Sequence, residues 1–180
     1  MRYIKKLSVV FTLLIMLVFG TVSVHAGENY HIFDLDDSLT NEEENILASR
    51  QIELEQKTGL FIAVVITDNL EGKSSQAYAD DFYDEYFGIN TNGILLLLDN
   101  QSQWDHISTS GSAINLYSEA YIDKIFKAMD FSLHRGDCYG AAGCFLSMLD
   151  KNAMFWYEFR GMFVTGLAAG AVISLIVCLV

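Results

Sequence analysis

Two short apolar runs constrain the fold of this chain more than any other feature. Leu60 to Thr67 reads LFIAVVIT, and Ile94 to Leu98 reads ILLLL. An uninterrupted apolar run of this length is typical of a strand that is buried on both faces. Strands of that kind occur mostly in parallel sheets that helices cover on both sides. The two runs therefore predict an α/β protein.

Helix signals surround these runs. Thr40 or Asn41, followed by three glutamates, is typical of a helix start, and Gly59 is typical of a helix end. Ser74 or Ser75 can cap a second helix that continues through Phe87. In chain order we expect helix 41–58, strand 60–67, helix 75–87, strand 94–98, strand 106–109, and helices at about 118–130 and 138–150.

The connections between the strands predict the topology. A helical crossover joins the first two strands, so they should be parallel with a right-handed connection. The turn residues Asp99 to Ser102 join the second strand to the third, which should be its antiparallel hairpin partner. We therefore expect a three-layer α/β/α domain with a small mixed sheet.

The N-terminal residues resemble a secretory signal. Lys5 and Lys6 precede an apolar run from Leu7 to Phe19, and a small-x-small cleavage site ends at Ala26. An uncleaved N-terminal anchor is the alternative. Both interpretations place the rest of the chain outside the cytoplasm, because the basic end stays inside. We assign residues 1–26 to the signal peptide and 27–152 to the folded domain.

The C-terminal residues resemble a membrane span. Met162 to Val180 is a stretch of 19 residues without a charge, which is long enough to cross a bilayer as a helix. Residues 153–161 form a juxtamembrane segment whose aromatic residues suit the membrane interface. No basic cluster follows Val180, which predicts that the natural chain continues. We expect a domain tethered to the cell membrane on its extracytoplasmic side, with the lipid bilayer and other membrane proteins as neighbours.

The net charge of the chain limits the classes of molecule that it can bind. The 180 residues carry a formal net charge of -12. Three of the 11 basic residues, Arg2, Lys5 and Lys6, lie at the start, which leaves eight against all 23 acids, a net of -15. So acidic a surface repels phosphate backbones, which excludes nucleic acid and favours divalent cations and basic proteins.

The segment YADDFYDEY, residues 78–86, concentrates four of these acids. On a helix, one face would hold the aromatic residues and pack on the sheet, and the other would hold the aspartates. The sheet-facing set would be Tyr78, Ala79, Phe82 and Tyr86, and the opposite set Asp80, Asp81 and Asp84. Two interpretations remain open for the aspartates, a solvated polar face or part of a cation site, because hard cations require several oxygen ligands.

Topology suggests two edges where such a site could form. At the lower edge, α-helical Asp80, Asp81 and Asp84 would approach Asn92 and the helix start at Glu119. We predict that Asp80, Asp81, Asp84 and Glu119 are metal ligands, with Ca²⁺ as the cation. At the upper edge, where ligands of such sheets often bind, a rival set would be Asp36, Asp37, Asp68 and Asp99.

Other familiar chemistry is missing from the sequence. The motifs G-x-S-x-G, H-E-x-x-H, C-x-x-C and the phosphate-binding loop do not occur, so we assign no catalytic residue and no organic cofactor. Cys138 and Cys144 lie six residues apart, and an exported pair of this kind can oxidise. On a helix, however, these positions point about 240° apart, which opposes a disulfide.

The chain resembles the TPM domain family over about residues 30–150. Four motifs carry the resemblance, in this order: IFDLDDSLTNEEE at 32–44, DNLEGKSSQAYADDFYD at 68–84, NTNGILLLL at 90–98 and ISTSGSAI at 107–114. The family implies an α/β/α fold in a membrane-tethered extracytoplasmic domain. Calcium binding, acid phosphatase activity and a role in photosystem repair have been proposed for chloroplast relatives.

The resemblance extends to single residues. The acidic helix motif of the family matches Asp80, Asp81 and Asp84, its Asn-x-Gly turn matches Asn92 and Gly93, and its strand-end glycine matches Gly111. Two positions depart from the family pattern: Glu119 stands where an aspartate is usual, and Gln103 stands where an arginine is usual. Arginine is a natural partner of phosphoryl oxygens, so its loss weakens the phosphatase interpretation more than the cation interpretation.

Three functions follow as hypotheses. The first is a tethered domain that binds a divalent cation and acts in the assembly or upkeep of envelope proteins. The second is a metal-dependent acid phosphatase. The third is an interaction module without metal, which pairs membrane helices through Gly166 and Gly170.

Overall fold

The computed structural model describes residues 30–102 and 104–153. Its elements are β1 (Ile32–Asp34), α2 (Asn41–Thr58), β2 (Phe61–Thr67), α3 (Ser75–Phe87), β3 (Gly93–Asp99), β4 (His106–Ser110), α4 (Ala113–Leu116) and α5 (Glu119–Leu133). A further helix occupies residues 138–153. The predicted strands and long helices are all present, with boundaries that differ from the expected ones by a few residues.

The strands form one sheet in the order β1-β2-β3-β4. β1 pairs with β2 and β2 with β3 in parallel, and β4 pairs with β3 in antiparallel orientation. In register, Val64 of β2 lies opposite Leu96 of β3, and Leu96 lies opposite Ile107 of β4. This arrangement confirms the predicted α/β fold with a small mixed sheet.

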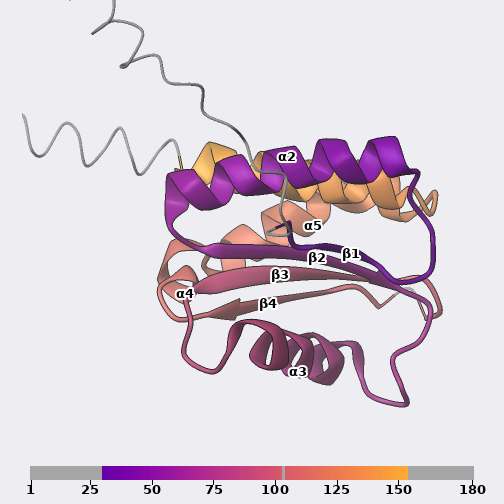
Figure 1. Ribbon diagram of the computed structural model, residues 1–180, viewed down its shortest axis with the longest axis horizontal. Coiled ribbons are helices and arrows are strands. Elements are labelled where there is room, and N and C mark those ends of the chain that lie inside the picture. The colour runs from indigo at the N-terminus through magenta and orange to yellow at the C-terminus, as the bar shows by residue number, and fades with distance from the viewer. Residues whose placement is uncertain (1–29, 103, 154–180) are drawn as a thin grey trace, which may run out of the picture.

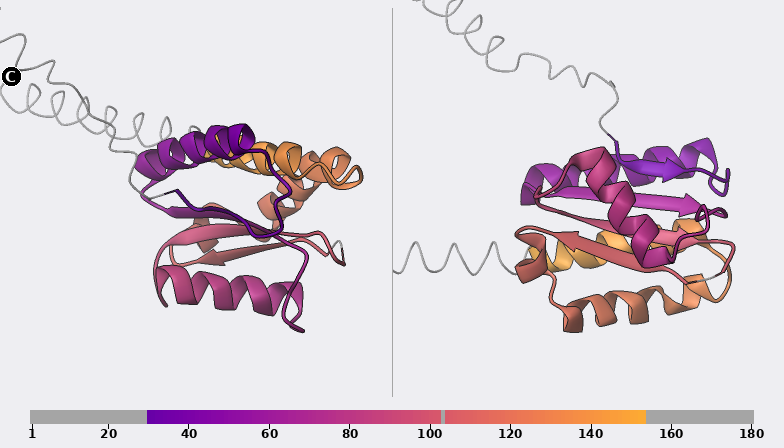
Figure 2. Two further views of the ribbon diagram at one scale, coloured as in Figure 1. Left: turned by 45° about the vertical axis from the view of Figure 1, so that its right-hand side comes forward. Right: turned by 90° about the horizontal axis from the view of Figure 1, so that it is seen from below.

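Helices cover both faces of the sheet. α2, α5 and helix 138–153 lie over one face, and α3 lies over the other (Figures 1 and 2). Side chains alternate along the central strands, so Ile62 and Val64 pack toward the first group of helices, and Ala63 and Val65 pack toward α3. Every residue of β3 is buried, which is the physical basis of its uninterrupted apolar sequence.

The helix ends use the capping residues that the sequence contains. Thr40 accepts a hydrogen bond from the main-chain N–H of Glu43, whose side chain accepts one from the N–H of Thr40 in return. α2 ends at Gly59, whose φ of 70° is the left-handed conformation that glycine favours. The hydroxyl of Ser74 caps α3 by accepting from the N–H of Ala77, 3.2 Å away.

Two elements were not predicted, and one predicted helix face is wrong in part. β1 and α4 have three and four residues, too few to show a periodic pattern. In α3 the predicted sheet-facing residues Tyr78 and Ala79 are buried, but Tyr86 is 57% exposed, and Tyr83, which the prediction left out, is 2% exposed. The reason is that α3 contacts β3 and β4, which turns its inward face toward Tyr83 and Asp80.

The predicted signal peptide (1–26), the membrane span (162–180) and the juxtamembrane segment from residue 154 lie outside the described residues. Within the part that is described, no helix combines the length and the apolar character needed to span a bilayer. Cys138 and Cys144 lie on the same helix as free thiols.

Candidate functional site

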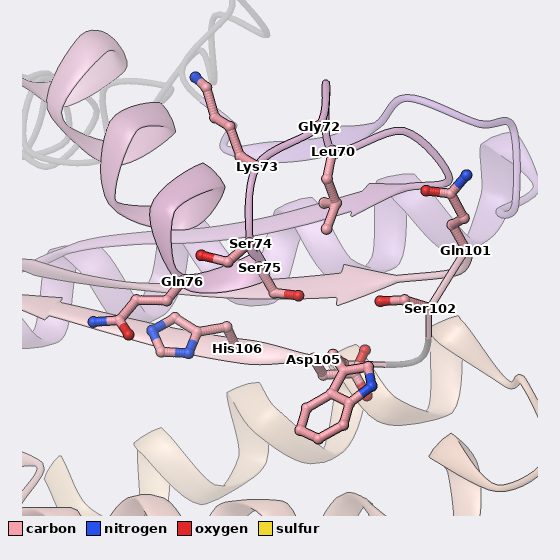
Figure 3. Close-up of a pocket in the computed structure, with 11 residues that line it drawn as sticks. Leu70, Gly72, Lys73, Ser74, Ser75, Gln76, Gln101, Ser102, Asp105 and His106 are labelled. Carbon is pink, nitrogen blue, oxygen red and sulfur yellow. The ribbon is translucent and has the colours of Figure 1, made fainter.

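A cavity of about 500 Å³ opens at the edge of the sheet where β2 and β3 end. It lies between the first turn of α3 and the β3–β4 turn (Figure 3). Open α/β sheets usually bind ligands at this position, beyond the carboxyl ends of parallel strands. Its polar and charged lining comes from Lys73, Ser74, Ser75, Gln76, Gln101, Ser102, Asp105 and His106.

The carboxylate of Asp99 anchors the turn beside this cavity. Its side chain is 1% exposed, and one oxygen accepts hydrogen bonds from the main-chain N–H groups of Gln101 and Ser102, at 3.0 and 3.2 Å. The other oxygen accepts from the hydroxyls of Ser102 and Ser75, whose side chains point toward each other in Figure 3. Asp99 is thus a saturated structural carboxylate that joins the turn to the start of α3.

Asp105 lies beside Asp99 but is much less well satisfied. Its Oδ1 accepts a hydrogen bond from the main-chain N–H of Asp99, at 3.0 Å. Burial, and to a smaller extent the negative charge of Asp99, raise the pKa of the Asp105 carboxyl. Two carboxylates are therefore close together here, and one of them is destabilised in its charged form.

A second, small cavity shares Asp105 with the first and extends toward the C-terminal end of α5. Its volume is about 30 Å³, which is the share of one water molecule in liquid water. Four of its eight lining residues carry side-chain oxygens: Asp99, Asn100, Asp105 and Asp137. A single ion or water molecule fits this space.

Asn100 ties this edge to the loop before α2. Its side-chain N–H₂ group donates to Asp36 and to the hydroxyl of Ser38, at 2.8 and 2.9 Å. Although burial raises the pKa of Asp36, the hydrogen bonds from Ser38 and Asn100 outweigh it and lower the pKa below its ordinary value. The thiol of Cys138 donates to the Asn100 side-chain oxygen at 3.4 Å.

Of the predicted upper set, Asp36 and Asp99 take part in these hydrogen-bond networks, whereas Asp37 and Asp68 are exposed.

The lower set is distributed over separate surroundings. Asp80 accepts a hydrogen bond from the hydroxyl of Ser108 on β4, at 2.5 Å. Asp81 is 62% exposed and pairs with Lys73 at 2.9 Å. Asp84 is exposed on α3. Glu119 begins α5, which packs on the opposite face of the sheet from α3.

Among residues 30–102 and 104–153, no group of three or more His, Cys, Asp or Glu side chains is arranged to hold a metal ion. The structure thus brings Asp80 to β4 but does not gather Asp80, Asp81, Asp84 and Glu119 around one point. Their assignment as ligands stays a prediction.

The motif residues Asn92, Gly93 and Gly111 have structural roles at the lower edge. The side-chain oxygen of Asn92 accepts a hydrogen bond from the main-chain N–H of Ser112, at 2.8 Å. A Cβ at Gly111, whose φ is 60°, would lie 2.3 Å from that same oxygen. A Cβ at Gly93 would lie 2.4 Å from the hydroxyl of Tyr83. These residues therefore allow close packing of the turn before β3 against the end of β4.

Sequence reasoning missed Asp105 and Asn100. Both lie in the hairpin connection that follows Asp99, so they return to the edge at which β3 ends. Their position in that connection was the available signal, because residues of a short hairpin turn stay near the strand ends they join. Gln103, at the departure from the family pattern, lies outside the described residues.

Three solved structures share this fold. The N-terminal domain of a protein from P. gingivalis has a TM-score of 0.60 and 15% identity, covering 66% of this chain and 79% of that one. The N-terminal domain of the cg2496 protein from Corynebacterium glutamicum has a TM-score of 0.59 and 13% identity, covering 74% and 86%. The BA42 protein from the psychrophilic bacterium Bizionia argentinensis has a TM-score of 0.56 and 19% identity, covering 67% and 82%. Identities this low show the fold alone.

The sequence comparisons identify the family. No curated protein matches the chain. The protein-family model described as TPM domain matches residues 32–151, which run from the start of β1 to within two residues of the end of helix 138–153. The chain belongs to the TPM domain family.

Proposed function

We propose that this domain binds one divalent cation at the carboxyl edge of the sheet, with Asp105 as its principal carboxylate. The observation that carries the proposal is the Asp99–Asp105 pair: burial and the charge of Asp99 raise the pKa of Asp105. A cation beside Asp105 would offset both effects, since an opposite charge favours the ionised carboxyl.

The residues around the small cavity fit a hard cation in part. Asp105, Asn100 and Asp137 can supply carboxylate and amide oxygens, which Ca²⁺ accepts in irregular geometry. Ca²⁺ takes six to eight oxygen ligands, so water would complete the shell. With few protein ligands, we expect a dissociation constant of roughly 10⁻⁴ to 10⁻³ M, the range of extracellular calcium modules.

Calorimetric titration of the full-length chain with CaCl₂ tests this proposal. We expect saturable binding in the wild-type chain and in Asp81→Asn, and its loss in Asp105→Asn. The opposite result, with binding lost only in Asp81→Asn, would assign the cation to the predicted set of Asp80, Asp81, Asp84 and Glu119. No binding at millimolar Ca²⁺ in any of the three would contradict both positions.

The cellular role that we propose is the assembly or upkeep of envelope proteins by a membrane-tethered, extracytoplasmic domain. It is supported by the signal-like start and the apolar end of the sequence, together with the acidic net charge of -12. Protease accessibility of the domain in intact cells tests the location: cleavage from outside is expected, and protection would contradict it.

Metal-dependent phosphate-ester hydrolysis is a second candidate function, and the residues that line the larger cavity favour it. The first turn of α3 and the side chain of His106 line the same space as Asp105. Helix N-termini bind phosphate groups, and a cation can neutralise phosphoryl charge. Turnover of p-nitrophenyl phosphate that is lost in Asp105→Asn and kept in Asp81→Asn would support this candidate, whereas turnover equal in both would indicate a contaminant.

A further inference from the structure

The two faces of the sheet are covered unequally. α2, α5 and helix 138–153 lie over one face, whereas in the described part of the chain α3 is the one helix over the other (Figure 2). α3 contacts β3 and β4, at the far side of the sheet from β1. On the α3 face, side chains rather than a helix therefore cover the region beside β1.

Aromatic side chains fill that region. The ring of Phe33 on β1 lies 5.0 Å from Phe82 and 4.6 Å from Tyr86, measured between ring centroids. Beside them the surface is hollowed into a groove of about 410 Å³, whose apolar lining also includes Tyr78 and Leu35. We call this hollow the β1 groove. Leu35 is 54% exposed, so its floor presents large apolar surface to solvent.

The outer edge of β1 adjoins the groove. The carbonyl of His31 accepts from Val64, and the N–H of Leu35 donates to Ile66, both at 2.9 Å. Main-chain groups of alternate strand residues point to opposite sides, so those of Ile32 and Asp34 point away from β2. In the described residues no strand pairs with this side of β1. Ile32, which is 5% exposed, and Asp34, which is partly exposed, therefore have no partner among the described strands on this side, and a fifth strand could pair with both.

The rim of the β1 groove is acidic. Glu71, Asp81 and Glu85 line it, and the one basic side chain among its lining residues is Lys73, which pairs with Asp81. Three carboxylates against one ammonium leave the rim net negative. An aromatic floor beneath carboxylates suits arginine and lysine, whose aliphatic stems pack on rings while their charged ends reach acidic groups.

We propose that β1 and the β1 groove bind an extended basic segment of a partner protein, which adds as a fifth strand beside β1. Residues i, i+2 and i+4 of a strand share a face. The face of the segment that lies on the groove would therefore carry a basic residue, an apolar residue and a second basic residue at these three positions. The main chain of the segment would pair with Ile32 and Asp34. The carboxylates that this interaction uses do not include Asp105, although Lys73 lines both the β1 groove and the cavity beside Asp105.

A synthetic peptide tests this proposal directly. The probe is acetyl-TRTFTRT-amide, labelled with fluorescein, which places Arg, Phe and Arg on one face of a strand. Its anisotropy is measured against the full-length chain at low and physiological salt. We expect binding that weakens with salt, and at least tenfold weaker binding in the double variant Glu71→Gln/Glu85→Gln. Glu53→Gln, an exposed acid on α2, is the matched control and should stay within twofold of wild type.

Two further peptides separate strand addition from general charge attraction. The charge-reversed TETFTET should not bind. Two forms of the probe that are N-methylated at alternate amides should differ, because only one set of amides can face β1. Hydrogen exchange at residues 32–34 should slow when the parent probe is bound.

Several results would overturn the proposal. These are no binding of the probe, equal affinity for the two N-methylated forms, or binding without protection of residues 32–34. A dimer of the chain alone with protected residues 32–34 would assign the edge to a second copy instead.

Discussion

The main-chain N–H of Asp99 donates a hydrogen bond to the carboxylate of Asp105, with 3.0 Å between nitrogen and oxygen. This contact fixes two carboxylates side by side in the turn between β3 and β4. Hydrogen-bond donors surround Asp99, whereas the pKa of Asp105 is raised because burial disfavours its charged form. Because its carboxylate has fewer hydrogen-bond donors than that of Asp99, Asp105 is the carboxylate at this edge that is free to bind a cation.

Asp105→Asn should stabilise the cation-free protein at neutral pH. The folded-state pKa lies above the ordinary value of 3.8, so ionisation of Asp105 costs stability as the pH rises through that interval. Asparagine keeps the acceptor for the Asp99 N–H without the charge. We expect a gain of roughly 0.5–1 kcal/mol in the free energy of unfolding at pH 7. Urea unfolding in the presence of EDTA measures it.

The pH dependence provides the control for that variant. Below pH 3.8 Asp105 is protonated in both folded and unfolded chains, so the difference between wild type and Asp105→Asn should disappear. An equal difference at pH 3 and pH 7 would show that the charge is not its cause.

Asn100→Ala should destabilise the protein, and more at neutral pH than in acid. Asn100 donates to Asp36 and Ser38, more than 60 positions away in the chain, and these bonds help to lower the pKa of Asp36. Because that pKa is lowered, its stabilising contribution is present above the ordinary value of 3.8 and is lost as the pH falls through the folded-state value. We expect a loss of about 1–3 kcal/mol at pH 7, measured by urea unfolding, and a smaller loss at pH 2. An unchanged stability at pH 7 would contradict the role of Asn100.

Gly111→Ala should cost more stability than Gly136→Ala, although both glycines have similar φ angles of 60° and 64°. At Gly111 a Cβ would lie 2.3 Å from the Asn92 side-chain oxygen and 2.9 Å from the carbonyl of Thr91. At Gly136 it would meet no atom within 4 Å. We expect about 1 kcal/mol of backbone strain at both positions, with a further 1–3 kcal/mol at Gly111 from overpacking. Thermal unfolding of the two variants checks this, and equal losses would contradict it.

Tyr117→Phe should leave stability unchanged or raise it by up to about 1 kcal/mol. The Tyr117 side chain is buried, and within the described residues its hydroxyl has no hydrogen-bond partner. Its neighbour Tyr121 is the matched control, since its hydroxyl donates to the carbonyl of Met148 at 2.7 Å. Tyr121→Phe should lose about 1 kcal/mol. Equal effects of the two substitutions on urea unfolding would show that Tyr117 has a partner in solution.

Much of the fold could be predicted because its signals are local and periodic. The apolar runs that become β2 and β3, the Thr40 capping box and Gly59 each specify their own element. β1 could not be found in this way, because three residues have no period and their pairing with β2 is a tertiary contact. The face of α3 was misjudged in part, at Tyr83 and Tyr86, for a related reason. Whether Tyr83 or Tyr86 is buried depends on where the helix crosses the sheet, which the sequence of the helix does not specify.

In the candidate site, too, the residues with a local sequence signal could be predicted, and those placed by tertiary contacts could not. The position of Asp99 at the carboxyl edge of the sheet could be predicted, because the apolar run of β3 ends at this residue. The partners of that residue could not, since Asp105 and Asn100 reach it through a turn whose path depends on hydrogen bonds to Asp99 and Asp36. For Asp81, the charge density of the segment, the expected topology and the family motif suggested a ligand, whereas the structure pairs it with Lys73.

Anomalous scattering from a crystal of the protein grown with millimolar Ca²⁺ tests the central claim most directly. We expect a peak about 2.3–2.6 Å from the carboxylate of Asp105, the distance at which Ca²⁺ binds oxygen. A peak beside Asp81 and Asp84 instead, or no peak at either edge of the sheet, would contradict it.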